Sequence, residues 1–232
     1  MDTCLRIHSE KGTEQPRLAL ILDMDGVLVD SNPIHRQAWR AYNLRFGIET
    51  DETMQERMYG RHNDDIVRDF FGSNLSAGEV ARHGAAKESL YRELMTAVLD
   101  QSLVPGVRAF LERHAAAPLA LASNAEPANV AFVLDRSGLR HYFRVVIDGD
   151  QVRKPKPDPE MYLLTARRLG VRPSEAMVFE DSEAGLTAAR AAGMRTVGVR
   201  TTHSRLPGAG LEIDDFLSRE LEPWLRTQTQ PC

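Results

Sequence analysis

Short apolar runs alternate with longer amphipathic segments from residue 18 through most of the chain. Apolar runs of this kind, bounded by polar residues, are typical of strands that are buried on both faces of a parallel sheet. The segments between them carry apolar residues at helical spacing, and Pro127 stands where it can open a helix. We expect strands at residues 18–22, 119–122, 145–147, 177–179 and 196–199, with helices at 107–116, from 127, at 159–169 and at 184–192.

The stretch from residue 34 to residue 102 has a different pattern, with apolar positions at helical spacing and no strand signal. Gly47, Gly60 and Gly72 mark short connections of the kind that join helices in a bundle. The alternation of strands and helices resumes after Pro105. We therefore predict an α/β fold, a doubly wound, Rossmann-like parallel sheet with an inserted α-helical cap domain.

These predictions divide the chain into three parts. The α/β core is expected to be discontinuous, with residues 17–33 before the insertion and residues 103–232 after it, and the helical cap spans residues 34–102. Residues 1–16 are polar and without pattern, so we expect a flexible N-terminal extension there. The C-terminal tail, which includes Trp224, is expected to pack on the core.

The composition narrows the class of protein. The 232 residues are 42% hydrophobic and 27% charged, which is ordinary for a folded protein. A net charge of −4 argues against nucleic acid as a partner. No apolar stretch approaches the roughly 20 residues that cross a bilayer, so no membrane association is expected. The N-terminus lacks the apolar segment of a secretory signal, and Cys4 and Cys232 stand alone, so we expect a cytoplasmic protein without a disulfide. The oligomeric state is left open.

Two carboxylates follow the first predicted strand with one apolar residue between them, in the segment Asp23-Met24-Asp25-Gly26. Carboxylates this close at the end of a buried strand are costly to keep ionised unless a cation lies between them. Gly26 allows a sharp turn and a close approach of backbone amides to a ligand. The pattern favours a site for a hard cation such as Mg²⁺ and for a phosphate, although Asp and Gly are also common in surface turns.

Polar residues also follow the later strands, whose carboxyl ends share one rim in a parallel sheet. Ser123 and Asn124 follow the second strand, Lys154 comes after the third, and Glu180 and Asp181 follow the fourth. Each has a structural alternative, because Ser and Asn can cap a helix, a lysine is commonly solvated, and acids can stabilise a helix N-terminus. Taken together they predict a second acid pair, a hydroxyl and a lysine around one ligand.

These four motifs, in this order and spacing, resemble those of the haloacid dehalogenase superfamily of phosphohydrolases. The similarity is to the branch of β-phosphoglucomutase-like phosphatases, which carry a helical cap after the first strand, and it covers nearly the whole chain past residue 17. The resemblance implies a Mg²⁺-dependent phosphatase of small phosphorylated metabolites such as sugar phosphates.

The resemblance also implies a role for the acidic residues. Asp23 would attack phosphorus and form an aspartyl phosphate, and Asp25 would protonate the leaving alcohol and then activate water. The Mg²⁺ ligands would be Asp23, the backbone carbonyl of Asp25, and Asp181, with Glu180 inside or just outside the coordination shell.

Phosphate binding is assigned by the same resemblance to Ser123, the backbone amide of Asn124, and Lys154. We expect the neighbouring Lys156 to be a solvated surface lysine. Ser182 is expected to cap the helix that follows it.

Two other families with similar residues fit less well. Dehalogenases of the superfamily lack the second acid of the first motif, because displacing a halide needs no protonated leaving group, and here Asp25 is present. Receiver domains also combine an aspartate, an acid pair, a hydroxyl and a lysine, but they are much shorter and are not interrupted after the first strand.

Residues of the predicted cap would select the substrate. His35 and Trp39 match positions that β-phosphoglucomutases also carry, although two residues four apart can simply pack a helix. Arg61 and Lys87 are candidate cations, and Asn63 stands where the mutases have the arginine that grips a second phosphate.

Ala125 and Glu126 occupy the positions of a serine and a lysine that also hold this second phosphate in the mutases. A carboxylate at Glu126 would repel a phosphate. We therefore expect a phosphatase. A phosphohexomutase of the β-phosphoglucomutase type is the alternative, and a non-catalytic phosphate-binding module is the third hypothesis.

Overall fold

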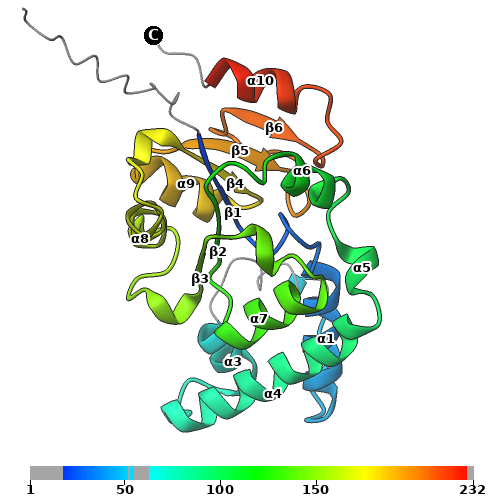
Figure 1. The fold of residues 1–232 in the computed structure, drawn as a ribbon. Coiled ribbons are helices and arrows are strands. Elements are labelled where there is room, and N and C mark those ends of the chain that lie inside the picture. Colours follow the sequence, from blue (N-terminus) through cyan, green and yellow to red (C-terminus); the bar gives the residue numbers. More distant parts are fainter. Residues whose placement is uncertain (1–17, 52, 55–62, 229–232) are drawn as a thin grey trace, which may run out of the picture.

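A six-stranded sheet forms the centre of the protein, with the strands in the order β3-β2-β1-β4-β5-β6 (Figure 1). The computed structural model describes residues 18–51, 53–54 and 63–228. All neighbouring strands are parallel, and the chain winds outward in both directions from β1 and β4, as in a doubly wound fold. The strands are β1 (Ala19–Leu22), β2 (Leu119–Ala122), β3 (Val145–Ile147), β4 (Ala176–Glu180), β5 (Arg195–Val199) and β6 (Leu211–Ile213).

Helices connect the strands and cover the sheet. In chain order the α-helices are α1 (Asn32–Leu44), α3 (Asn63–Phe71), α4 (Ala77–Thr96), α5 (Leu99–Ser102), α6 (Val107–Arg113), α7 (Pro127–Arg136), α8 (Glu160–Leu169), α9 (Glu183–Ala191) and α10 (Leu221–Gln228). Three short 3₁₀ turns are η1 (Arg140–Tyr142), η2 (Gly149–Gln151) and η3 (Pro173–Glu175).

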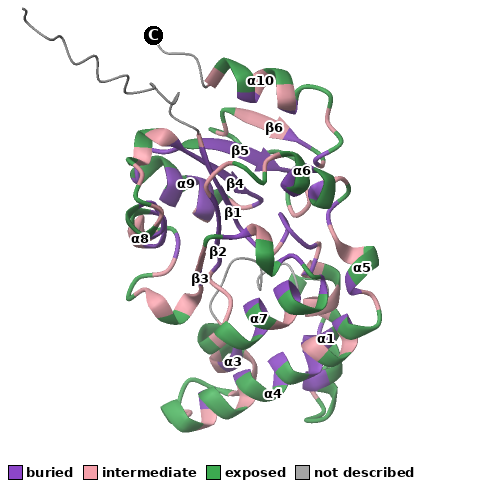
Figure 2. Ribbon diagram, in the orientation of Figure 1, coloured by how far each residue is buried: buried purple, intermediate pink, exposed green. Residues whose placement is uncertain are grey.

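Side chains of the strands alternate between two apolar layers, because successive residues of a strand point to opposite faces. Leu20 and Leu22 of β1 belong to the layer that holds buried residues of α6, α7 and α10. Ala19 and Ile21 belong to the layer that holds buried residues of α8 and α9. Both faces are covered, and β1, β2 and β4 are therefore buried along their whole length (Figure 2).

The predicted fold class is confirmed, and the observed bounds of the five predicted strands differ from the predicted bounds by at most one residue. The strand β6 and the helix α10 were not predicted. A strand of three residues at the edge of a sheet carries too few apolar positions to be recognised. Trp224 of α10 packs against the apolar core as expected.

The described residues between β1 and α6 form helices and contain no strand. These helices occupy the lower part of the view in Figure 1, where α4 runs along α1 and α3. A capping box starts α4, because the Ser76 hydroxyl accepts from the backbone N–H of Glu79 while the Glu79 carboxylate accepts from the N–H of Ser76. Trp39, Tyr42 and Ile66 are buried between these helices. The exact limits of the predicted cap stay a prediction.

The segment that leaves the sheet for these helices lies beside the segment that returns. Val29 and Leu103 form an antiparallel bridge. The backbone N–H of Asp30 donates to the carbonyl of Ser102 at 2.7 Å, and the N–H of Val104 donates to the carbonyl of Leu28 at 3.2 Å. The two connections between the sheet and these helices are thus joined side by side.

Some predictions fall on residues outside the described ranges. These are the N-terminal extension, both cysteines, and Arg61 in the predicted cap. Within the described part of the chain, no helix combines the length and the apolar character needed to cross a membrane.

Candidate active site

The loops that follow β1, β2 and β4 bring polar side chains to one rim of the sheet. Asp23 follows β1, Ser123 follows β2, and Asp181 follows β4. These strands are neighbours and run parallel, so their carboxyl ends coincide. All three side chains are buried, and they line a cavity of about 750 Å³ that is also lined by residues of α1, α3, α4 and α7.

The turn after Asp25 brings the first motif against the fourth. Gly26 has a φ of 76°, in the left-handed region that favours glycine, and a Cβ there would lie 2.0 Å from Asp181 Oδ2. The hydroxyl of Thr201, in the loop after β5, donates to the carbonyl of Gly26 at 2.5 Å. Thr202 donates to the carboxylate of Asp181. A side chain at residue 26 would therefore displace Asp181 from the rim.

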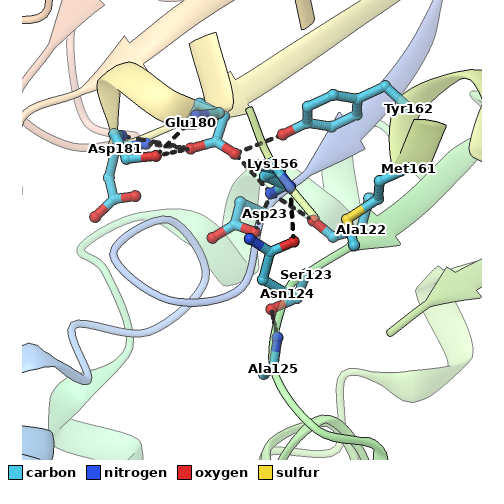
Figure 3. Close-up of polar contacts among 12 residues, drawn as sticks. Asp23, Ala122, Ser123, Asn124, Ala125, Lys156, Met161, Tyr162, Glu180 and Asp181 are labelled. Atoms are coloured by element: carbon cyan, nitrogen blue, oxygen red, sulfur yellow. Dashed lines mark hydrogen bonds and ion pairs between the residues drawn. The ribbon is translucent and has the colours of Figure 1, made fainter. Parts of the chain in front are cut away.

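The prediction for Lys154 is wrong, and so is the expectation that Lys156 is solvated. The Lys154 side chain is 73% exposed and its Nζ lies 3.7 Å from Asp158 at the surface. The Lys156 side chain is 5% exposed and points into the rim, where Nζ donates to Asp23 Oδ1 at 2.6 Å, Glu180 Oε1 at 2.6 Å and the carbonyl of Ala122 at 3.0 Å (Figure 3).

Lys156 is buried, and Lys154 is not, because carboxylates around Lys156 compensate its positive charge. A lysine whose Nζ is buried needs acceptors for its protons, and the carboxylates of Asp23 and Glu180 supply them. Burial alone would lower the pKa of Lys156, but the two carboxylates outweigh it and hold the pKa above its usual range. Lys156 therefore places a positive charge beside Asp23.

Glu180 is held by groups on every side. Its Oε1 accepts from Lys156 and from the buried Tyr162 hydroxyl at 2.5 Å, and its Oε2 accepts from the backbone N–H of Asp181 at 3.1 Å and from the Ser182 hydroxyl at 3.0 Å (Figure 3). A Cβ at Gly185 would lie 1.9 Å from its carboxyl carbon. Glu180 thus has one fixed position beneath the start of α9.

Ser182 has the capping role that we expected. Its hydroxyl accepts from the backbone N–H of Gly185 at 3.1 Å and so caps α9.

Asp23, Glu180 and Asp181 could hold a metal ion, since each offers a carboxylate oxygen and these oxygens lie within 4.8 Å of one another. Burial raises the pKa of Asp23 to about 7, with Lys156 acting in the opposite direction, and burial together with Glu180 raises the pKa of Asp181 well above its usual value. Three carboxylates here face one ammonium. A set of hard oxygen donors with an excess of negative charge fits Mg²⁺.

Ser123 and Asn124 lie beside Lys156. The Ser123 hydroxyl is buried and accepts from the backbone N–H of Ala125 at 3.1 Å. The Asn124 carboxamide oxygen accepts from the backbone N–H of Lys156 at 3.3 Å, so this residue fixes the loop that carries the lysine (Figure 3). Both residues line the cavity.

Asp25 lines the cavity, and its side chain is 28% exposed. Ser31 donates to its Oδ1 at 2.5 Å, and Nε2 of His35 lies 3.7 Å from the same oxygen. The other ring nitrogen of His35, Nδ1, is 2.8 Å from Nζ of Lys87, and the ring stacks on Tyr91 with the centroids 3.8 Å apart. Two of the predicted cap residues are thus linked to Asp25.

The remaining predicted cap residues lie around a second buried lysine. Nζ of Lys87 lies 5.1 Å from the centre of the Trp39 ring and donates to Glu88 Oε1 at 2.8 Å. Asn63 also donates to Glu88 Oε1, at 2.5 Å. Burial would raise the pKa of Glu88, but Lys87, His35 and these hydrogen bonds lower it to about 2. His35, Trp39, Asn63 and Lys87 all line the same cavity as Asp23.

Several residues of the site were missed by sequence reasoning. Tyr162 resembled any apolar position of α8, and Ser31, Glu88 and Thr202 belong to no motif. The only signal for Lys156 was its presence in the Lys-Pro-Lys-Pro segment, which holds two lysines and does not say which one turns inward.

The chain is similar to a known protein family, to curated phosphatases and to solved structures. The chain matches the family model of the haloacid dehalogenase-like hydrolases over residues 18–193. A fructose-1-phosphate phosphatase of Escherichia coli is 36% identical over 184 residues, which cover 78% of this chain and 95% of that protein. A phosphorylated carbohydrates phosphatase of Thermotoga maritima is 36% identical over 200 residues, covering 83% and 89%. A solved β-phosphoglucomutase structure from Clostridium difficile has a TM-score of 0.80 at 26% identity, covering 92% of this chain and 97% of that one.

Proposed function

The chain belongs to the haloacid dehalogenase-like hydrolases, and on this premise we propose that it is a phosphatase of small phosphorylated carbohydrates that works through an aspartyl phosphate on Asp23. The observation that carries the proposal is the position of Asp23, which is buried at the rim between Lys156, Ser123 and the acid pair of the fourth motif. The names of the two similar phosphatases support the choice of carbohydrate substrates.

Asp23 is the proposed nucleophile. Its carboxylate oxygen forms a bond to phosphorus while the bond between phosphorus and the ester oxygen breaks, and the alcohol leaves. Lys156, 2.6 Å from Oδ1, favours the ionised form of Asp23 against the effect of burial and would compensate negative charge on the phosphoryl oxygens. Water then attacks phosphorus of the aspartyl phosphate and releases phosphate.

Asp25 is the proposed acid and base. It donates a proton to the leaving oxygen in the first step and accepts a proton from the attacking water in the second. Its partial exposure and its contacts with Ser31 and His35 suit a carboxyl group that exchanges protons with the cavity. Ser31 belongs to the connection to the helices, so a movement of these helices would change the environment of Asp25.

Phosphate binding is proposed for the Ser123 hydroxyl, the Asn124 backbone amide and Lys156. These groups come from the ends of neighbouring loops, and the Asn124 side chain holds the backbone of Lys156. The proposed phosphate-binding lysine is thus Lys156 and not the predicted Lys154. The chemistry is the same, because a lysine ammonium still faces the phosphate.

Mg²⁺ is the proposed cofactor, with Asp23 and Asp181 as ligands and Glu180 beside them. When bound, the ion would screen the repulsion between the Asp23 carboxylate and the phosphate dianion. Glu180 positions Lys156 as well, because its Oε1 is an acceptor for Nζ.

The helices α1, α3 and α4 are the proposed cap, and they supply His35, Trp39, Asn63 and Lys87 to the cavity. These side chains would contact the carbohydrate part of the substrate and exclude water from the aspartyl phosphate. The bridge between Val29 and Leu103 marks the proposed hinge.

The first test is phosphate release from a panel of sugar phosphates, nucleotides and p-nitrophenyl phosphate, with Mg²⁺ and with a chelator. The Asp23→Asn variant is expected to lose at least about 10⁴-fold in kcat while keeping its thermal unfolding temperature. Release that does not depend on Asp23 would rule out the proposed nucleophile. Metal binding without turnover of any compound would favour the phosphate-binding module.

A mutase remains the second candidate, since the chain is also similar to a β-phosphoglucomutase in structure. The discriminating experiment offers β-glucose 1-phosphate together with glucose 1,6-bisphosphate and measures glucose 6-phosphate. Isomerisation faster than phosphate release would favour the mutase.

A further inference from the structure

One wall of the active-site cavity consists of carboxylates and amides from α3, α4 and α7. Its members, named here the polar wall, are Asn63, Glu88, Glu126 and Asn129, and all four line the cavity. Asn129 and Glu88 are buried, while the Glu126 side chain is 33% exposed. None of these four residues has a role in the phosphoryl transfer proposed above.

Hydrogen bonds fix the polar wall between the cap helices and the core. The Asn129 side chain donates to Glu88 Oε2 at 2.7 Å and accepts from Arg92 Nη1 at 2.6 Å. Arg92 also donates to Glu126 Oε1 at 2.5 Å. Glu126 is the N-cap residue of α7, Asn129 lies in its first turn, and Glu88 and Arg92 belong to α4. The contacts therefore join two separate elements.

The cavity meets the carboxylate of Glu126 rather than the guanidinium of Arg92. Glu126 and Asn129 line the cavity, and Arg92 does not, so the arginine contacts them from behind. Hydrogen bonds of Glu126 within the described chain go to Oε1, which leaves Oε2 for a ligand.

Away from the rim, the described lysine and arginine residues that line the cavity are Arg36 and Lys87. Lys87 is paired with Glu88 at 2.8 Å. Asp64, Asp65 and Asp150 add further carboxylates among the described lining residues. A second phosphate dianion at this wall would meet like charge, whereas sugar hydroxyls can donate to carboxylate and amide oxygens.

Resting on the proposed phosphatase function, we propose that the cavity selects monophosphates whose remaining part is an uncharged polyol, and that Glu126 is the specificity-determining residue that rejects a second phosphate. The phosphate lies at the rim beside Asp23, and the hydroxyls of the polyol face the polar wall. Arg92 acts as a positioning residue for Glu126.

The test compares fructose 1-phosphate with fructose 1,6-bisphosphate, which differ only in the second phosphate. Wild-type protein is expected to have a kcat/KM at least about 10-fold higher for the monophosphate, because a buried or half-buried like-charge contact costs on that order. The Glu126→Gln variant is expected to reduce this preference about 5-fold or more, and Glu126→Lys is expected to reduce it further.

The matched control is Asp135→Asn, which removes one carboxylate from an exposed position of the same helix, outside the cavity. It should leave the preference as in the wild type, which excludes an effect of net charge. Raising the salt concentration should change the preference of Glu126→Gln less than that of the wild type, since the removed repulsion is electrostatic.

The outcomes separate this inference from the proposed function. No release from either fructose phosphate or from any monophosphate of the panel would overturn the phosphatase and the inference with it. Release of phosphate from both compounds with equal kcat/KM, or an unchanged preference in both Glu126 variants, would overturn the inference and leave the phosphatase standing.

Discussion

Two regions of the cavity each surround a buried lysine. They differ in the number of carboxylates that compensate the positive charge of that lysine. Lys156 at the rim faces two carboxylates and a carbonyl, and it lies 4.9 Å from the centre of the Tyr162 ring. Lys87 in α4 faces one carboxylate and a histidine nitrogen, and it lies over the Trp39 ring.

The pKa values of Lys87 and Lys156 therefore shift in opposite directions. Burial lowers the pKa of Lys87, and Glu88 only partly restores it, whereas two carboxylates raise the pKa of Lys156. The number of carboxylates within reach, rather than burial itself, therefore decides whether a buried lysine keeps its charge firmly. The rim holds a lysine whose positive charge two carboxylates favour, while the cap side holds a lysine whose charge a single carboxylate favours.

The largest effect is expected from the Lys156→Met variant. It is expected to lose about 10³-fold in kcat/KM, because the charge that faces the phosphoryl oxygens disappears and Asp23 loses its partner. The matched control is Lys154→Met, two residues away with an exposed side chain, which should stay within about twofold of the wild type. Steady-state phosphate release measures kcat/KM for both variants. Equal losses of kcat/KM in the two would contradict the assignment of the phosphate-binding role to Lys156 rather than Lys154.

Removing the cap-side lysine is expected to lower stability. Lys87→Met should lower the free energy of unfolding by about 3 kcal/mol, because it leaves the buried Glu88 carboxylate without its ammonium partner. The double variant Lys87→Met with Glu88→Gln should regain most of this loss, since no uncompensated charge remains. Urea denaturation measures both, and a double variant as unstable as the single one would refute the pairing argument.

A smaller effect is expected from pH. The pKa of Glu88 is lowered from 4.5 to about 2 in the folded protein, so its stabilising contribution is complete above pH 4.5 and is lost as the pH falls toward 2. The difference in free energy of unfolding between wild type and Glu88→Gln should shrink by about 2 kcal/mol between pH 6 and pH 3. Denaturation curves at several pH values test this, and a difference that stays constant would mean that Glu88 is not ionised.

Local pattern was enough to predict the architecture of the core. Apolar runs place the central strands, and the residue that follows each run falls on the rim, because parallel strands share a direction. Asp23, Ser123 and Asp181 could thus be placed beside one another before any side chain was seen. The edge strand β6 was not predicted, because three residues carry too little periodicity.

The sheet, the order of the motifs and the chemistry at the end of each strand could be predicted from the sequence, since they depend on residues that are close along the chain. The folded arrangement of the elements determined which lysine of the Lys-Pro-Lys-Pro segment turns inward and which side chains hold Glu180. It also decided that Glu88, Arg92 and Asn129 join α4 to α7. These outcomes depend on partners 18 to 133 residues apart, because a buried charge goes where compensating groups from other elements meet.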